Sequence, residues 1–195
     1  MDCIKIGKLI ASLRKEKGLT QQEIADALGI TNKTVSKWEC GLGCPDLSLW
    51  GDLSVILGVD IAQLMEGQIS PNQPDSGNMN RARFYVCPVC GNILFSTGGA
   101  SIFCCGRKLE PLSPAQNGGP AVSVEQIDGE YYVTVDHSMT KEQYLSFAAY
   151  VKNERIFFTR SYPEQNPAFR FPFVPYGTLY LYSTKSGLFS YPGIK

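Results

Sequence analysis

The sequence predicts a multidomain protein in which a small all-α domain precedes a short cysteine-rich module and an all-β sandwich. Apolar residues recur at helical spacing over the first 67 residues, whereas β-branched and aromatic runs separated by Gly and Pro fill the chain after Arg81. Four of the seven cysteines lie close together at the start of this second pattern. We expect a helical domain at 1–67, a flexible linker at 68–80, the cysteine-rich module at 81–112 and the sandwich at 113–195.

Five short helices in series account for the first domain. Ile6, Ile10 and Leu13 recur on one face of the first helix, as a buried stripe requires. Helix boundaries carry the usual signals, since Thr20 and Glu23 form a capping box at the start of the second helix. We expect helices near residues 4–17, 21–28, 32–39, 46–57 and 61–65.

Strands dominate the remainder of the chain. Residues 68–80 are polar, contain two prolines and a glycine, and have no apolar face, which predicts a flexible linker. Beyond it, many short strands predict an antiparallel, immunoglobulin-like sandwich. The run 144–151 fits either a helix or a strand by pattern alone. We expect strands near residues 84–86, 122–124, 131–135, 156–159 and 179–182.

Composition narrows the classes of protein to consider. The formal net charge is zero, and all seven basic residues of the first domain lie before residue 38, so any basic face must come from the first three helices. No run approaches the about 20 apolar residues that a membrane span needs, and the start lacks a signal-peptide core. We expect a cytoplasmic protein without a membrane partner. In that reducing compartment, cysteines serve as metal ligands or redox thiols more often than as disulfides.

The segment at residues 19–41, LTQQEIADALGITNKTVSKWECG, resembles the core of the Cro and phage-repressor (XRE-type) helix-turn-helix family. The resemblance extends over about residues 4–67 and includes a three-residue turn at 29–31. It implies a sequence-specific transcription regulator that binds double-stranded DNA as a homodimer on a palindromic operator. In such domains the second helix meets a phosphate and the third enters the major groove.

The outward face of the third helix holds the candidate base-reading residues. Val35 and Trp38 face inward by spacing. Arg14 and Glu39 match a pair in the resembled family that ties the first helix to the end of the third. The alternatives are an ordinary solvated helical face and a protein-interaction module. The resemblance implies base contacts by Asn32, Lys33 and Lys37 and phosphate contacts by Gln21 and Thr31, while Thr34 and Ser36 complete the candidate set by spacing.

A four-cysteine set predicts a metal site. Cys87 and Cys90 form a Cys-x-x-Cys pair, and the adjacent Cys104 and Cys105 follow after a short stretch. Four thiolates suit one tetrahedral zinc or iron ion per chain. The adjacent pair makes residues 84–109 resemble desulforedoxin, the rubredoxin-like module of desulfoferrodoxins, in which four cysteines bind one iron. Two roles stay open, a structural ion and a sensor of metal or redox state.

The other three cysteines stand apart from this set. Cys40 and Cys44 flank the end of the third helix, where a thiol switch is conceivable. Isolated thiols in a reducing compartment usually behave as small apolar residues. We therefore expect Cys3, Cys40 and Cys44 to be inert.

Residues 121–189 resemble the sandwich domain of superoxide reductases, on three anchors at 122–135, 137–144 and 179–189. In that family four histidines and one cysteine bind the catalytic iron, and a lysine near the first histidine assists; the lysine falls here at Gly118 or Gly119. Only His137 is retained, so we expect no enzyme and a satisfied histidine. The positions that match the five ligands are Pro120, His137, Gln143, Ser183 and Ser186.

Three functions follow from these observations. The first is a DNA-binding transcription regulator with a structural or sensing zinc or iron site. The alternative is an iron-dependent redox protein, either superoxide reductase-like or an electron carrier, with a DNA-binding appendage. A third is an interaction adaptor held together by zinc. The retained sandwich then serves dimerisation, ligand binding or partner contact.

Overall fold

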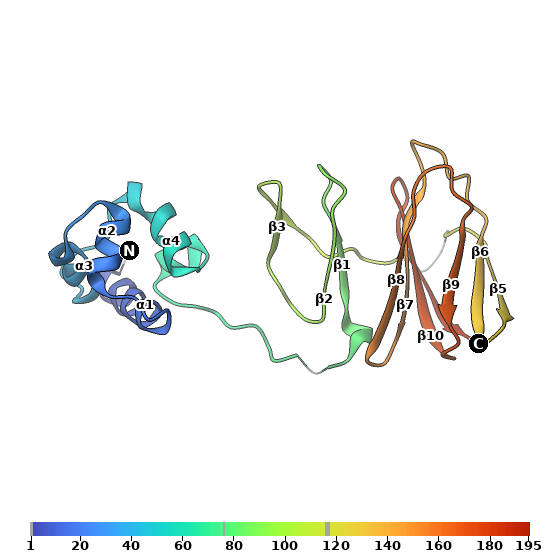
Figure 1. Ribbon diagram of the computed structural model, residues 1–195, viewed down its shortest axis with the longest axis horizontal. Coiled ribbons are helices and arrows are strands. Elements are labelled where there is room, and N and C mark those ends of the chain that lie inside the picture. The colour runs from blue at the N-terminus through green and yellow to red at the C-terminus, as the bar shows by residue number, and fades with distance from the viewer. Residues whose placement is uncertain (1, 76, 116–117) are drawn as a thin grey trace. The chain divides into compact units, whose positions relative to one another are not determined.

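The computed structural model describes residues 2–75, 77–115 and 118–195. The chain divides into two compact units, Met1–Pro71 and Asn72–Lys195 (Figure 1). Among the described helices, none combines the length and the apolar character that crossing a lipid bilayer requires. The first unit is helical and the second consists mainly of strands.

The five helices expected in the first unit are confirmed, with one difference. The fourth region is divided, because Asp46 caps a 3₁₀ turn, η1, before the α-helix begins. Thr20 and Glu23 make the expected capping box. The helical elements are α1 (Cys3–Glu16), α2 (Gln21–Leu28), α3 (Asn32–Glu39), η1 (Leu47–Leu49), α4 (Trp50–Leu57) and α5 (Ile61–Glu66).

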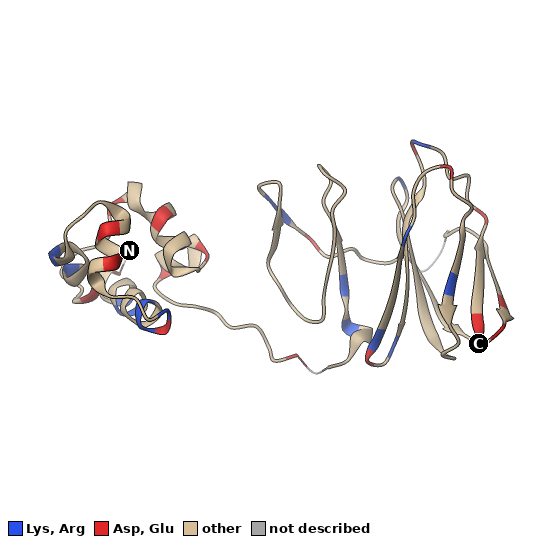
Figure 2. Cartoon of the chain, in the orientation of Figure 1, with Lys and Arg blue, Asp and Glu red and all other residues tan. Residues whose placement is uncertain are grey.

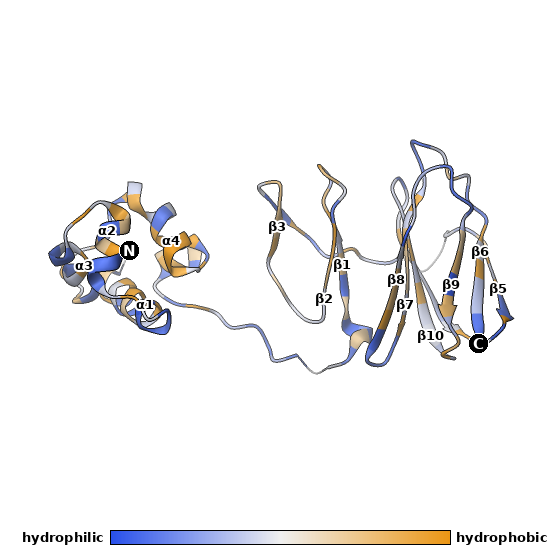
Figure 3. Ribbon diagram, in the orientation of Figure 1, coloured by the Kyte–Doolittle hydropathy of each residue, from blue (hydrophilic) through white to orange (hydrophobic). Residues whose placement is uncertain are grey.

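One buried core holds these helices together. Ile10 from α1, Ile24 from α2 and Val35 from α3 are fully buried in it, and part of α4 is orange, that is hydrophobic, in Figure 3. Helices α1 and α3 approach each other closely at Gly7, where an added Cβ would overlap the carbonyl oxygen of Trp38. Glycine is therefore required at this crossing.

Cys3 and Cys44 form a disulfide bond, with 5.0 Å between their Cα atoms. The expectation of inert thiols was wrong for these two residues. Helix α1 packs along α3, so its first turn meets the chain that leaves α3, and Gly41 lies against Ile4. Two cysteines that are 41 residues apart thereby become neighbours. Cys40 is a free, exposed thiol.

The second unit begins with two small hairpins. Strand β1 alternates between two environments: Phe84 packs against the sandwich, whereas Tyr85 and Cys87 pack inward against Leu109. This alternation places one face of β1 in the cysteine-rich module and the other on the sandwich. The elements are η2 (Met79–Arg81), β1 (Arg83–Val86) paired with β2 (Ile93–Ser96), and β3 (Ile102–Cys104) paired with β4 (Arg107–Leu109).

Seven antiparallel strands form the sandwich. Strand order is β11-β10-β7-β8 in one sheet and β5-β6-β9 in the other. Tyr131 and Phe171 from the smaller sheet meet Tyr150 and Leu181 from the larger one in a core between them. The strands are β5 (Val122–Ile127), β6 (Glu130–Val135), β7 (Leu145–Lys152), β8 (Arg155–Arg160), β9 (Ala168–Pro172), β10 (Gly177–Ser183) and β11 (Gly187–Ile194).

Strand β7 is buried on both faces. Ala148 and Tyr150 face the other sheet, whereas Phe147, Ala149 and Val151 face the β1–β2 hairpin. The segment that fitted either a helix or a strand is therefore a strand, since its continuous apolar run serves two cores.

Candidate nucleic-acid interface and metal centre

Helix α3 presents a polar face whose opposite side is anchored in the core. Thr31 caps the helix by accepting a hydrogen bond from the backbone N–H of Thr34 at 3.3 Å. Val35 and Trp38 are buried. Five of the seven candidate DNA-binding residues lie on this helix: Asn32, Lys33 and Lys37 are exposed, and Thr34 and Ser36 are half-buried.

The capping residue and the first residue of α2 make contacts within the protein. The Thr31 hydroxyl lies 2.9 Å from that of Thr34, in addition to its capping bond. Gln21 donates from Nε2 to Oε2 of Glu39 at 2.8 Å. The spacing of Gln21 and Glu39 in the sequence carried no signal for this contact, which arises where α2 meets the end of α3.

Glu39 is the centre of a network that orients α1, α2 and α3. Its carboxylate accepts hydrogen bonds from Arg14 Nε at 2.6 Å and from Arg14 Nη2 at 3.0 Å. Arg14 also donates to the carbonyl oxygen of Leu19 at 2.8 Å. Burial raises the pKa of Glu39, but the bonds from Arg14 and Gln21 outweigh it and hold this pKa below its ordinary value. The pair expected from the resemblance is therefore present as a bidentate ion pair.

Basic residues of the helical unit are confined to α1, α3 and the residue that follows α1. Figure 2 shows them in blue, and α2, α4 and α5 contain none. Asp46, Asp52, Asp60 and Glu66 lie after α3. The exposed side of α3 therefore contributes Lys33 and Lys37 to the basic residues of this unit.

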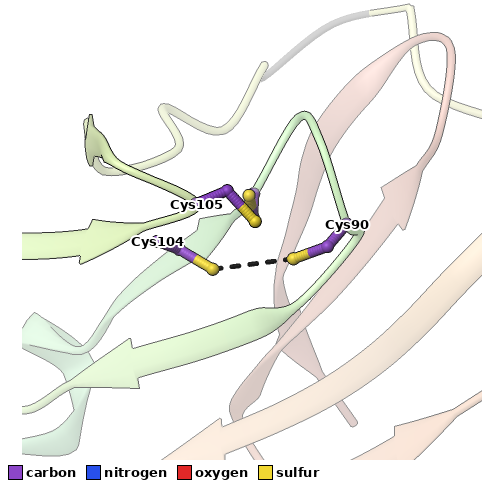
Figure 4. A group of neighbouring side chains, drawn as sticks. Cys90, Cys104 and Cys105 are labelled. Carbon is purple, nitrogen blue, oxygen red and sulfur yellow. Dashed lines mark hydrogen bonds between the residues drawn. The ribbon is translucent and has the colours of Figure 1, made fainter.

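The four-cysteine set comes together in space. The sulfur atoms of Cys87, Cys90, Cys104 and Cys105 all lie within 4.8 Å of one another. Figure 4 shows Cys90, Cys104 and Cys105 pointing toward one another from two hairpins, with 3.5 Å between the sulfurs of Cys90 and Cys104. No other group of three or more His, Cys, Asp or Glu side chains with this geometry occurs among the described residues.

Tight turns create this arrangement. After the first pair, the N–H of Gly91 donates to the carbonyl of Cys87 at 2.9 Å, with Gly91 in the left-handed region at φ 67°. After the second, Cys105 and Gly106 both have positive φ. Glycine adopts this conformation without steric cost, so each glycine lets the chain turn back behind its cysteine pair.

The electrostatics of the cluster favour a bound cation. Backbone N–H groups of Cys90 and Val89 donate to the Cys87 sulfur and lower the pKa of this thiol to about 6. The neighbouring thiols of Cys90, Cys87 and Cys104 raise the pKa of Cys105 to about 12. Like charges at these distances disfavour one another, and a cation removes that penalty. The donor set fits a metal that prefers four soft ligands.

The positions that match the superoxide reductase ligands also come together, but without the donors. They line a pocket of about 260 Å³ at one end of the sandwich. His137 accepts at Nδ1 from the N–H of Met139 at 3.1 Å and faces the Ser183 hydroxyl with Nε2 at 3.4 Å. Burial lowers the pKa of His137, and both ring nitrogens have a polar partner within the protein. One imidazole with Ser183, Ser186 and Gln143 does not fit an iron that needs nitrogen and sulfur ligands.

The helical unit matches a known family, and the chain has curated relatives. The family model described as helix-turn-helix matches residues 10–64. The chain is 43% identical over 61 residues to the SPbeta prophage-derived uncharacterized HTH-type transcriptional regulator YonR of Bacillus subtilis (strain 168), covering 31% of this chain and 56% of the relative. It is 31% identical over 65 residues to the HTH-type transcriptional activator BcrR of Enterococcus faecalis, covering 33% and 32%. The chain thus spans about half of one relative and a third of the other.

Among solved structures, the superoxide reductase from Treponema pallidum is similar to this chain with 18% identity and a TM-score of 0.49, covering 56% of this chain and 97% of that one. The restriction-modification controller protein C.AhdI from Aeromonas hydrophila is similar with 28% identity and a TM-score of 0.31, covering 32% and 96%. Residues 10–64 are a helix-turn-helix domain, and the curated relatives of the chain are transcriptional regulators.

Proposed function

We propose that this protein is a sequence-specific DNA-binding transcription regulator with one metal ion in its four-cysteine site. The observation that carries the proposal is the placement of α3 within a helix-turn-helix domain, with its buried side held by Val35 and Trp38. Its exposed side offers Asn32, Lys33 and Lys37. A helix with a fixed core side and a free polar side can enter the major groove without distorting its domain.

The side chains on α3 have the chemistry of base readers. An Asn amide pairs with the N6 and N7 atoms of adenine, and a Lys ammonium donates to the O6 and N7 acceptors of guanine. Asn32 and Lys33 therefore read a mixed site, with Lys37 one turn further along the helix. Thr34 and Ser36 flank these residues, and Gln21 and Thr31 contact phosphates.

The DNA partner is a palindromic double-stranded operator bound by a homodimer in the cytoplasm. Two copies related by a twofold axis place two α3 helices in successive major grooves, with half-sites about one helical turn apart or a multiple of it. The direct test is selection from random DNA, followed by competition between the selected and scrambled sequences. Binding only the selected DNA, by a dimer in light scattering, supports the proposal. Equal binding of both sequences contradicts it.

The metal site, in a module at 81–112 ahead of the sandwich at 113–195, holds one zinc or iron ion through Cys87, Cys90, Cys104 and Cys105. Such an ion supplies the positive charge that keeps four neighbouring thiolates ionised. Its simplest role is structural, because the small β1–β4 module has few buried residues of its own. Metal analysis and absorption spectra of protein purified without air identify the ion, since iron thiolate is coloured and zinc is silent.

The rival function is a redox enzyme or electron carrier with a DNA-binding appendage. The pocket around His137 argues against superoxide reduction, because Ser183 replaces the thiolate and Pro120 has no donor side chain. We expect no catalytic consumption of superoxide in stopped-flow measurements on iron-loaded protein, with iron counted per chain. Fast turnover, or a second tightly bound iron near His137, would establish the rival.

A further inference from the structure

We propose that Cys3 and Cys44 are a reversible redox pair that sets the stability of the helix-turn-helix domain. Their Cα atoms are 5.0 Å apart, within the range of natural disulfides. Cys3 is the first residue of α1, and Cys44 lies between α3 and η1. The bond therefore closes a segment that contains α1, α2 and α3.

Local contacts keep the two cysteines adjacent independently of the bond. Asp2 caps α1 by accepting from the N–H groups of Ile4 and Lys5. On the other side, Gly41 turns at φ 72°, and its N–H donates to the carbonyl of Trp38 at 2.9 Å. An added Cβ on Gly41 would press on Ile4, so the two segments touch. The reduced thiols are therefore held ready to form the bond again.

The environment of the pair suits small oxidants. Cys3 and Cys44 are half-buried, and Cys44 packs against the core of the helical unit. A low-molecular-weight disulfide can reach such a site more easily than a protein can. Cys40 differs, because it is exposed and free although it lies only four residues from Cys44. It therefore offers a matched control.

The chemistry is thiol–disulfide exchange with a low-molecular-weight disulfide such as oxidised glutathione. One protein thiolate attacks a sulfur of the reagent, forming a mixed disulfide and expelling one reagent thiolate. The second protein thiolate attacks the protein sulfur of that mixed disulfide and expels the other. The pair loses two electrons, the reagent gains them, and the two thiol protons pass to the two expelled thiolates. Excess reduced glutathione reverses both steps.

The bond acts on the unfolded chain more than on the recognition face. A disulfide stabilises a fold by restricting its unfolded ensemble, and the effect grows with the length of the closed loop, which is 41 residues here. Asn32 and Lys33 lie at the other end of α3 from Cys44. Oxidation therefore stabilises the folded domain and leaves the base-reading residues exposed. In a reducing compartment such a bond is transient. The fraction of protein that carries it depends on the ratio of oxidised to reduced small thiols.

The test uses the full chain in glutathione buffers of graded redox ratio. Thiols are trapped with N-ethylmaleimide and located by peptide mass spectrometry, which separates this pair from the four-cysteine set. Both tryptophans, Trp38 and Trp50, lie in the helical unit, so tryptophan fluorescence follows the melting of that unit. We expect Cys3 and Cys44 to lose reactivity together and the melting midpoint to rise by roughly 10 °C on oxidation.

Two variants make the test decisive. Cys3→Ser/Cys44→Ser abolishes the redox shift of the midpoint, whereas Cys40→Ser retains it. If the double variant fails to fold, wild type that is reduced and then blocked with N-ethylmaleimide is compared with oxidised wild type instead. Alkylation of Cys3 and Cys44 in the most oxidising buffer, or an unchanged midpoint, overturns the proposal. Neither readout involves DNA, so failure here is distinct from failure of the proposed DNA-binding function.

Discussion

Arg14 and Glu39 form a bidentate ion pair that joins the end of α1 to the end of α3. Two nitrogens of Arg14 donate to two oxygens of Glu39, at 2.6 and 3.0 Å. The side chains are only 13% and 8% exposed. Because Gln21 donates to the same carboxylate, this pair fixes the positions of α2 and α3 relative to each other, and with them the candidate DNA-binding residues.

Arg14→Met should lower the free energy of unfolding of the helical unit by about 2–4 kcal/mol. The substitution keeps much of the side-chain volume but leaves the buried carboxylate of Glu39 without its charged partner. Urea unfolding followed by tryptophan fluorescence measures the change. Lys8→Met, at an exposed position of the same helix, is the control and should alter stability by less than about 0.5 kcal/mol.

The same pair predicts an acid limit to stability. The pKa of Glu39 lies below its ordinary value of 4.5 in the folded state. Its contribution is therefore fully present above pH 4.5 and is lost as the pH falls through the folded pKa. Melting midpoints of the helical unit at several pH values should fall more steeply in wild type than in Glu39→Gln. Parallel pH profiles for the two proteins would contradict this assignment.

Gly7→Ala should destabilise the helical unit strongly, although alanine is the better helix former. The new methyl group would overlap the carbonyl oxygen of Trp38, so α1 and α3 must move apart. We expect a loss of about 2–4 kcal/mol, comparable to an overpacked core. Gly51→Ala on α4 is the matched control, because nothing lies within 4 Å of its added Cβ. It should be neutral or stabilise by up to about 1 kcal/mol.

Asn32→Ala and Lys33→Ala should each weaken binding to the selected operator by about 1–3 kcal/mol. Both side chains are exposed on α3, so the melting midpoint should not change. Fluorescence anisotropy with labelled operator at fixed salt measures the affinity. Lys185→Ala, an exposed lysine of the second unit, should bind like wild type. An unaltered affinity in both α3 variants would place base reading elsewhere.

Cys87→Ser should abolish the bound metal, and Cys104→Ser should do the same. Cys87 is the buried member of the set, and its sulfur has both the lowered pKa and the backbone N–H donors. Metal content per chain is the primary measurement, with hydrogen exchange expected to increase over residues 84–110. The melting of the helical unit should remain unchanged. Full metal content in the double variant Cys87→Ser/Cys104→Ser would mean that other residues are the ligands.

Local signals in the sequence were sufficient for the helical unit. Caps such as Thr20 with Glu23 and left-handed glycines such as Gly29 define helix ends within a few residues, so α2 and α3 were predicted with their observed bounds. The 3₁₀ turn η1 was missed because Asp46 caps a turn and a helix with the same contacts. Likewise, β7 remained ambiguous because burial on both faces removes the alternation that distinguishes a strand.

The candidate sites also differ in how far the sequence could predict them. The four cysteines could be identified because each of the two cysteine pairs is local in sequence and only two hairpins are needed to bring the pairs together. The Cys3–Cys44 bond and the Gln21–Glu39 contact could not, because each depends on how separate helices pack. The spacing of residues along the chain does not predict such contacts between separate helices. These long-range contacts became visible only with the structure.

The two-faced burial of β7 links the two hydrophobic cores of the second unit. Phe147 and Val151 complete the core under the β1–β2 hairpin, while Ala148 and Tyr150 complete the core of the sandwich. Separating the hairpin from the sheet would expose one side of the strand that holds the other core in place. A substitution that loosens the β1–β2 hairpin should therefore also weaken the packing of β7 in the core of the sandwich, one sheet-to-sheet spacing of about 10 Å away.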